Sequence, residues 1–145
     1  MFTPLYEINV DEENKNTRIK IEPNRRYLPR CSQCKEKVSK IHSYHKREIR
    51  DLNISESQVV IELHYRKIHC PRFGIRVEHF DFVCPGCRVT NQMANYIFRL
   101  CQFMTVKDVA NQVSLSWYQV KSIDKLNLKK TIQRQSDKKI KDTFY

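Results

Sequence analysis

Hydrophobic and polar residues alternate with a period of two in two short stretches near the N-terminus. The stretches are residues 6–10 and 17–22, and the polar residues 11–16 lie between them. Alternation of this kind is typical of strands that bury one face. The pattern therefore predicts a β-hairpin, which a basic connector bracketed by Pro23 and Pro29 joins to the rest of the chain.

A third alternating stretch, residues 58–65, predicts another strand. Its β-branched and aromatic side chains favour extended structure, and residues 53–57 before it are typical of a turn. Because a hairpin returns the chain to its starting point, we expect the segment after this strand to lie beside the segment before residue 41. The apolar face of the strand would be formed by Val59, Ile61, Leu63 and Tyr65.

The spacing of apolar residues changes to a helical period after residue 87. Thr90 or Asn91 suits the N-cap of a first helix, and residues 105–113 predict a second one. A third helix is expected from Trp117 onward. The apolar face of the first helix would be formed by Val89, Met93, Tyr96, Ile97, Leu100 and Met104.

The second and third predicted helices match the pattern of a helix-turn-helix motif, with residues 114–116 as the turn. Apolar residues fall where the corner between the helices needs them, and Ala110 is small where the helices approach closely. Ser114 stands where glycine is frequent in this motif, and serine also tolerates turns. The apolar corner positions are Val109, Val113, Leu115, Val120 and Ile123.

In DNA-binding motifs of this kind, the early residues of the second helix meet base edges in the major groove. Ser116 is expected to cap that helix. The alternative is an ordinary helical hairpin packed in a core, but the number of matched positions and the charge of the chain favour DNA binding. The candidate DNA-binding residues are Ser116, Trp117, Tyr118, Gln119, Lys121, Ser122 and Lys125.

The chain is strongly basic, with 27 Lys and Arg against 16 Asp and Glu and a formal net charge of +11. Such a balance favours polyanions, nucleic acid first and an anionic membrane second, although a solvated basic surface also accounts for it. No apolar run approaches the length of a membrane span, and residues 1–5 lack the pattern of a signal peptide. We therefore expect a cytoplasmic, nucleoid-associated protein that binds double-stranded DNA and not a membrane.

Three of the six cysteines have the spacing of zinc ligands. Cys31 and Cys34 form a Cys-x-x-Cys pair, which lets two thiolates converge on one ion, and tetrahedral zinc is the usual guest. The sequence CPRFG from Cys70 has the outline of a second such turn, but Phe73 stands where the last cysteine belongs. The predicted hairpin would bring Cys70 to the first pair, so the candidate metal ligands are Cys31, Cys34 and Cys70.

The fourth ligand of this site stays open. His69, His42, Cys84 or Cys87 are candidates, a water molecule would also complete three thiolates, and the site could be empty. Because a structural zinc site contributes about 10–16 kcal/mol, loss of one ligand predicts a weakened or lost zinc site. An open position also suits catalytic zinc, but no general base stands out beside it.

Cys84 and Cys87 form a second Cys-x-x-Cys pair just before the first predicted helix. A helix start lowers the pKa of a thiol, so a thiol enzyme is conceivable. A thioredoxin-like motif needs a βαβ context, which this chain lacks. Cys101 lies inside the predicted helix and is expected to be a small core residue.

The order of these features resembles the N-terminal half of bacterial insertion-sequence transposases of the ISL-three family. The resemblance rests on residues 31–34, on residues 42–52 with their Arg50-Asp51-Leu52 step, on residues 66–71, and on the helix-turn-helix. It covers roughly residues 5–125. It implies a zinc finger followed by a helix-turn-helix, which together recognise the terminal inverted repeats of the element during DNA transposition.

In that family a nuclease domain follows, in which three carboxylates bind divalent metal. Residues 126–145 hold only two acidic residues among six basic ones, so we expect a truncated transposase without the catalytic domain and with no catalytic residue. Phe73 in place of a ligand is what decay of an inactive copy would produce. Such a fragment would bind element ends and compete with a full-length transposase, which is its second expected partner. The alternative is a stand-alone helix-turn-helix transcriptional regulator, and a small zinc or thiol enzyme ranks third.

Together these patterns predict an α+β chain, with a small β-rich zinc-knuckle module followed by a helical helix-turn-helix module. We divide it into residues 1–30 (N-terminal β-hairpin and connector), 31–87 (zinc-finger-like β module), 88–126 (helix-turn-helix module) and 127–145 (basic tail).

Overall fold

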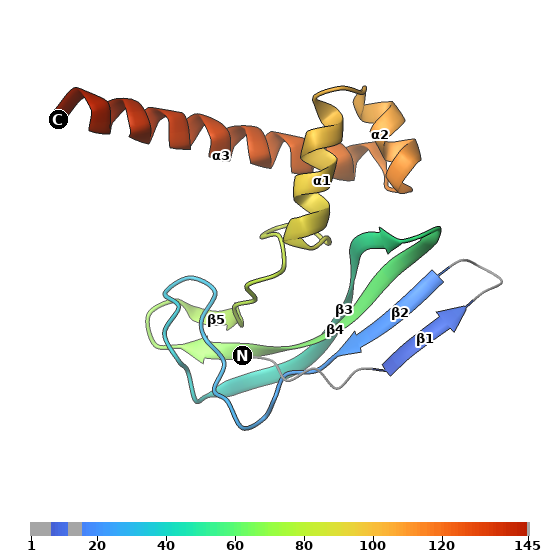
Figure 1. The fold of residues 1–145 in the computed structure, drawn as a ribbon. Coiled ribbons are helices and arrows are strands. Elements are labelled where there is room, and N and C mark those ends of the chain that lie inside the picture. The colour runs from blue at the N-terminus through green and yellow to red at the C-terminus, as the bar shows by residue number, and fades with distance from the viewer. Residues whose placement is uncertain (1–6, 12–15, 145) are drawn as a thin grey trace. The chain divides into compact units, whose positions relative to one another are not determined.

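The computed structural model describes residues 7–11 and 16–144 (Figure 1). Five strands precede three helices along the chain, which confirms the predicted α+β class. The chain divides into two compact units. The sheet unit comprises residues 1–83 and 88–90, and the helical unit comprises residues 84–87 and 91–145. We describe each by itself. None of the helices in the described part of the chain is both long and apolar enough to cross a membrane.

The sheet unit is built on one five-stranded sheet. Its strands are β1 (Glu7–Asp11), β2 (Asn16–Ile21), β3 (Ile41–Ile54), β4 (Ser57–Cys70) and β5 (Gly74–Val77). The order across the sheet is β1-β2-β4-β3, and β5 also pairs with β4. Strands β1 and β2 are antiparallel, which confirms the predicted N-terminal hairpin for the described residues, and β2 runs parallel to β4.

The long hairpin of β3 and β4 determines where the cysteines lie. The two strands pair antiparallel along their length, from Ile41 opposite Ile68 to Ile54 opposite Ser57. At the open end, the backbone N–H of His69 donates to the carbonyl oxygen of Lys40 at 2.9 Å. The end of β4 therefore returns to the segment that precedes β3, as the sequence predicts.

Strand β4 buries opposite faces in its two halves, because successive side chains of a strand point to opposite sides. In its first half the odd-numbered residues are buried, and Ile61 and Leu63 pack with Ile49, Phe80 and Val83. Tyr65 packs against the same cluster, as expected for the predicted apolar face. In the second half the even-numbered residues are buried, and a separate cluster holds Cys31, Val38, Ile68 and Cys70.

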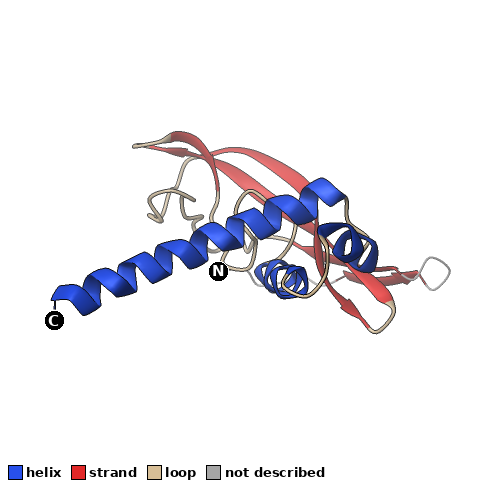
Figure 2. Cartoon of the chain, turned by 90° about the horizontal axis from the view of Figure 1, so that it is seen from above, coloured by secondary structure: helices blue, strands red, loops and turns tan. Residues whose placement is uncertain are grey.

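The helical unit contains α1 (Asn91–Cys101), α2 (Val106–Val113) and α3 (Trp117–Phe144). The buried side chains of these helices are Met93, Ala94, Ile97, Val109, Ala110, Val113, Val120 and Ile123. The predicted corner of α2 and α3 is thus packed, with Leu115 half-buried. Helix α3 continues without a break through 28 residues (Figure 2), which is about 42 Å at 1.5 Å per residue.

Two details of the predicted first helix are wrong. The helix begins at Asn91, and Val89 instead forms a bridge with Arg50 of the sheet unit and is buried there. Met104 lies beyond the end of the helix and is exposed. Periodicity alone placed both on the helix because apolar residues of adjoining segments continued its spacing.

Candidate metal centre and nucleic-acid interface

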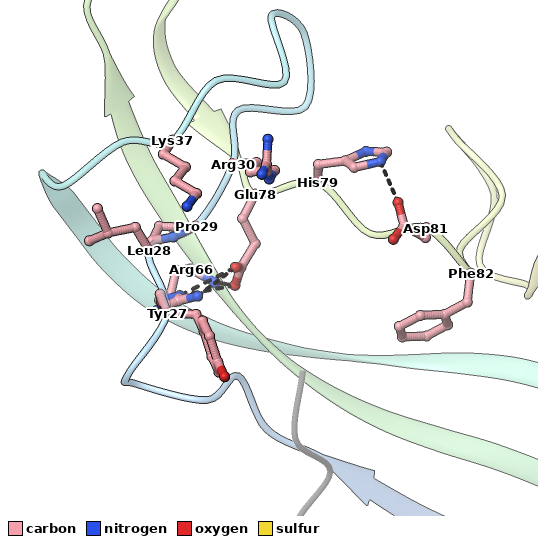
Figure 3. Close-up of a pocket in the computed structure, with 10 residues that line it drawn as sticks. All are labelled: Tyr27, Leu28, Pro29, Arg30, Lys37, Arg66, Glu78, His79, Asp81 and Phe82. Carbon is pink, nitrogen blue, oxygen red and sulfur yellow. Dashed lines mark hydrogen bonds and ion pairs between the residues drawn. The ribbon is translucent and has the colours of Figure 1, made fainter. Parts of the chain in front are cut away.

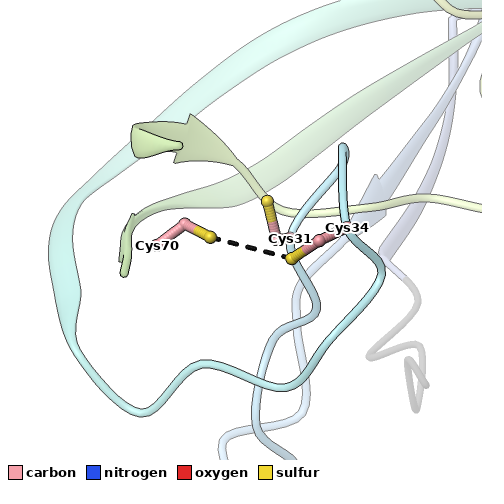
Figure 4. A group of neighbouring side chains, drawn as sticks. All are labelled: Cys31, Cys34 and Cys70. Carbon is pink, nitrogen blue, oxygen red and sulfur yellow. Dashed lines mark hydrogen bonds between the residues drawn. The ribbon is translucent and has the colours of Figure 1, made fainter. Parts of the chain in front are cut away.

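The three predicted metal ligands converge at the open end of the β3–β4 hairpin (Figure 4). Their sulfur atoms all lie within 4.8 Å of one another, and the Sγ atoms of Cys34 and Cys70 are 3.7 Å apart. Cys31 is 0% exposed and Cys70 is 5% exposed, whereas Cys34 is half-buried. The cluster therefore has a buried side and a side toward solvent.

The two turns that carry these cysteines have corresponding backbones. Lys35 follows Cys34 with a φ of 62°, and Gly74 follows Phe73 with a φ of 72°. Both angles lie in the left-handed region, which ends a tight turn and is costly for most side chains. Phe73 thus occupies the place that corresponds to Cys34, and its side chain is 41% exposed.

Backbone groups around the first turn favour one thiolate over the other. Burial of the Cys31 thiol opposes ionisation, but hydrogen bonds from the backbone N–H groups of Cys34 and Gln33 and from the neighbouring thiols outweigh it and lower the pKa of Cys31. At Cys34 the backbone N–H of Glu36 favours the thiolate. Burial and the thiols of Cys70 and Cys31 outweigh that contribution and raise the pKa of Cys34. Of these two thiols, Cys31 therefore ionises more readily than Cys34.

The cluster fits a tetrahedral thiolate metal centre. Zinc–sulfur bonds of about 2.3 Å at tetrahedral angles place neighbouring sulfurs about 3.8 Å apart, and the measured separation of Cys34 and Cys70 is 3.7 Å. Among the described residues, no histidine or carboxylate joins the three sulfurs within 4.8 Å. The two histidines considered as fourth ligands, His42 and His69, instead contact each other edge to face, with ring centroids 4.9 Å apart.

A buried ion pair, which the sequence does not reveal, lies at the same end of the sheet. The side chains of Arg66 and Glu78 are 6% and 3% exposed, with Nη2 and Oε2 2.9 Å apart. The backbone N–H of Arg66 donates to Glu78 Oε1 at 2.8 Å, and Arg66 Nη1 donates to the carbonyl oxygen of Tyr27 at 3.3 Å. The backbones of Glu78 and Cys31 also pair with each other in an isolated antiparallel β-bridge. The pair therefore fixes the strand beside the first cysteine turn.

This ion pair lies at a pocket of about 760 Å³ in the sheet unit (Figure 3). Apolar and basic side chains line it beside the pair, among them Tyr27, Leu28, Arg30 and Lys37. Because Arg66 and Glu78 satisfy each other, we assign this pocket no ligand. The sequence gives little sign of this pair, because Arg66 lies among other charged and polar residues of β4. Arg66 is buried because the even-numbered residues are the buried ones in the second half of that strand.

The candidate DNA-binding residues lie together on the exposed side of the first turns of α3. All seven are exposed, with Trp117 at 42% and Tyr118 at 77%, while Val120 and Ile123 between them are buried. The Nζ atom of Lys121 lies 4.5 Å from the centroid of the Trp117 ring, a cation–π contact. Trp117 lies at the surface, with more of its side chain covered than that of Tyr118.

The start of α3 carries a reciprocal capping box. The backbone N–H of Gln119 donates to Ser116 Oγ at 3.2 Å, and the backbone N–H of Ser116 donates to Gln119 Oε1 at 3.0 Å. These bonds satisfy two backbone donors that the helix leaves unpaired. The cap predicted at Ser116 is present. Gln119 shares in it through Oε1, so its amide NH₂ group takes no part in the cap.

Ser114 ends α2 with a φ of 55° and a ψ of 46°, in the left-handed conformation. Its backbone N–H donates to the carbonyl oxygen of Ala110. This is the turn position where the motif frequently has glycine, so serine accepts the conformation that glycine adopts most readily. At the other end of α2, Thr105 is the N-cap, and its Oγ1 accepts a hydrogen bond from the backbone N–H of Asp108 at 3.2 Å.

The second Cys-x-x-Cys pair belongs to the helical unit. Burial, together with the neighbouring Cys84 thiol, raises the pKa of Cys87 to about 12. The expectation that a helix start lowers the pKa of this thiol is therefore wrong for Cys87, because α1 begins only at Asn91 and burial dominates. Burial also raises the pKa of Cys101 at the end of α1. Neither has the low pKa of a thiol nucleophile.

Two family models match consecutive parts of the chain. The zinc-finger of transposase IS204/IS1001/IS1096/IS1165 matches residues 28–72, and the helix-turn-helix domain of transposase family ISL3 matches residues 78–126. Over these residues the chain belongs to the ISL3 transposase family. The ISL3 zinc-finger match covers all three clustered cysteines and stops one residue before Phe73. The ISL3 helix-turn-helix match covers α1, α2 and the first part of α3.

A curated relative agrees with this assignment and confirms the resemblance inferred from the sequence. The transposase for insertion sequence element IS1001 from Bordetella parapertussis is 32% identical over 111 residues, which are 76% of this chain and 27% of the relative. The chain thus spans about a quarter of the length of that ISL3-type protein. No solved structure matches the chain significantly.

Proposed function

We propose that the chain binds double-stranded DNA sequence-specifically, at the ends of an insertion element, through the exposed side of the first turns of α3. The observation that carries this proposal is the arrangement of the seven candidate residues from Ser116 to Lys125. They are exposed together, while Val120 and Ile123 on the opposite side hold the helix in its corner with α2. In helix-turn-helix proteins this side enters the major groove.

Different residues of this surface would have different tasks. Gln119 is exposed and uses only its Oε1 in the cap, so it suits a base edge, since Gln and Asn read bases by hydrogen bonds. Lys121 and Lys125 are exposed cations one turn apart and suit phosphates or guanine. Trp117 and Tyr118 are in edge-to-face contact, with ring centroids 5.2 Å apart, and offer apolar contact to a base or sugar. Ser116 and Ser122 are short hydroxyl donors beside them.

We assign the cysteine cluster a structural part in the same function. Cys31, Cys34 and Cys70 would hold a zinc ion that ties the connector to the end of β4. With three thiolates in place of four, binding is expected to be weaker than at a complete zinc finger. The other proposed partner is a full-length transposase, which would compete for the same element ends in the nucleoid. No residue is proposed as catalytic.

The direct test measures binding of the chain to a labelled duplex that carries the ends of its element, against a scrambled duplex of equal length. Specific binding should be at least tenfold tighter than binding to the scrambled duplex, and both should weaken as salt rises. Gln119→Ala should reduce the ratio of the two affinities, and Lys121→Ala should weaken both.

Lys138→Ala is the matched control, because it removes the same charge from the same helix about 26 Å farther along, at 1.5 Å per residue. It should leave the specificity ratio unchanged. Absence of binding at low salt would reject the proposal. Preference for a site unrelated to element ends would instead favour the transcriptional regulator.

A further inference from the structure

The fourth position of the cysteine cluster lies on its solvent side. Cys31 and Cys70 are buried, whereas Cys34 is half-buried and Phe73, its counterpart in the second turn, is 41% exposed. The turn position from which a fourth ligand would come is therefore partly exposed to solvent.

No described side chain supplies the missing donor to this position. Phenylalanine has no lone pair to offer, and the described histidines and carboxylates do not join the three sulfurs within 4.8 Å. A divalent ion held by three thiolates seeks a fourth ligand, because tetrahedral coordination is its stable arrangement. The three sulfurs also make the centre soft, and soft centres prefer a further sulfur donor.

The charges around the cluster favour an anion at that position. A divalent ion with three thiolates has a net charge of about −1 by formal counting, but basic side chains stand on both turns. Lys35 directly follows Cys34 and donates from Nζ to the carbonyl oxygen of Ser32 at 2.7 Å. Arg72 directly precedes Phe73 and is 68% exposed, with Glu36 Oε1 3.8 Å away. Lys35 offsets part of the charge that an anionic ligand would add, whereas the charge of Arg72 is shared with Glu36.

We propose that the cluster is a three-thiolate metal centre whose fourth ligand is a low-molecular-weight thiolate taken from solution. On binding, one metal–sulfur bond forms, the solvent ligand leaves, and the proton of the thiol passes to the buffer without any change in oxidation state. This inference rests on the metal binding proposed above and is independent of DNA binding. It makes occupancy of the ISL3 finger in this chain responsive to the concentration of small thiols.

Cobalt(II) in place of zinc provides the test, with 2-mercaptoethanol as the probe and a phosphine as the only reductant beforehand. The near-ultraviolet charge-transfer absorption of thiolate-bound cobalt(II) increases with the number of cobalt–sulfur bonds. Addition of 2-mercaptoethanol to the full chain should raise this absorption by about one third, as four bonds replace three. The titration should saturate, and imidazole should not reproduce the increase.

Two substitutions at one position sharpen the result. Phe73→Cys should start at the higher absorption and not respond to 2-mercaptoethanol, whereas Phe73→Ser, which removes the ring without adding sulfur, should respond as the unaltered chain does. The proposal is overturned if the unaltered chain shows no increase, or if it already has the absorption of four thiolates. If the unaltered chain already has the absorption of four thiolates and Cys84→Ser lowers it to that of three, the fourth ligand is Cys84. The titration of the unaltered chain supports or overturns the proposal by itself, so the test does not depend on the folding of either variant.

Discussion

The sheet unit and the helical unit hold their functional side chains in place by different means. In the helical unit, apolar residues such as Val109 and Ile123 fill the corner, and the capping box at Ser116 fixes the start of α3. In the sheet unit, the cysteine turns meet around three thiols and one buried ion pair. An apolar corner tolerates gradual change, whereas polar clusters depend on every partner being present. Phe73, the counterpart of Cys34, lies in the more sensitive of the two arrangements.

The largest expected effect is on the buried ion pair of the sheet unit. Glu78→Gln keeps the size of the side chain but leaves the buried charge of Arg66 unpaired, which should destabilise the unit by about 3–5 kcal/mol. Hydrogen exchange of the β4 and β5 amides measures the loss. Glu48→Gln, which alters an exposed ion pair with Arg18, should change exchange little. Equal effects of the two substitutions would contradict the role given to Glu78.

A comparable loss is expected in the corner of the helical unit. Ile123→Ala removes a buried side chain and should lower the free energy of unfolding by about 2–5 kcal/mol. Trp117, the single tryptophan of the chain, lies in this unit and reports its unfolding by fluorescence. The neighbouring exposed residue gives the control, since Ser122→Ala should shift the transition by less than about 0.5 kcal/mol. A negligible effect of Ile123→Ala would show that the corner is not the source of stability.

Restoration of the fourth ligand should have a smaller effect that depends on metal. Phe73→Cys should tighten zinc binding at least tenfold, about 1.4 kcal/mol, because the turn already has the backbone of its counterpart at Cys34. Competition with a chromophoric chelator measures the affinity. Thermal stability of the variant should rise with zinc and not with a chelator present. A rise that is the same in both conditions would mean that the substitution acts through packing and not through the metal.

The smallest expected effect concerns the cap of α3. Ser116→Ala removes the acceptor of the Gln119 N–H and should cost about 1 kcal/mol. Ser116→Asp keeps an acceptor and should recover most of the loss in stability. Denaturant unfolding followed by Trp117 fluorescence resolves the two variants. If both lose stability equally, the hydroxyl group does not act as the cap.

The two hairpins, the convergence of Cys31, Cys34 and Cys70, and the helix-turn-helix could be predicted, because each depends on local periodicity and on the return of a hairpin. The order of the strands across the sheet, with β2 parallel to β4, could not, because it depends on pairing between segments far apart in the sequence. The burial of Arg66 could not, since it depends on the face of β4 that the connector covers. The raised pKa of Cys87 could not be predicted either, because the burial of its thiol is set by packing and not by its neighbours in sequence. The place of Phe73 in its turn could be read from the sequence, but the equivalence of the Lys35 and Gly74 backbones required the structure.

Whether the first turns of α3 read DNA is decided by the affinity of the chain for element-end and scrambled duplexes over a range of salt concentrations, with Gln119→Ala and Lys138→Ala measured in parallel. We expect a preference for the element end that Gln119→Ala reduces and Lys138→Ala does not, and affinities that fall linearly with salt on logarithmic axes. Equal affinity for the two duplexes, unchanged by Gln119→Ala, would contradict this expectation.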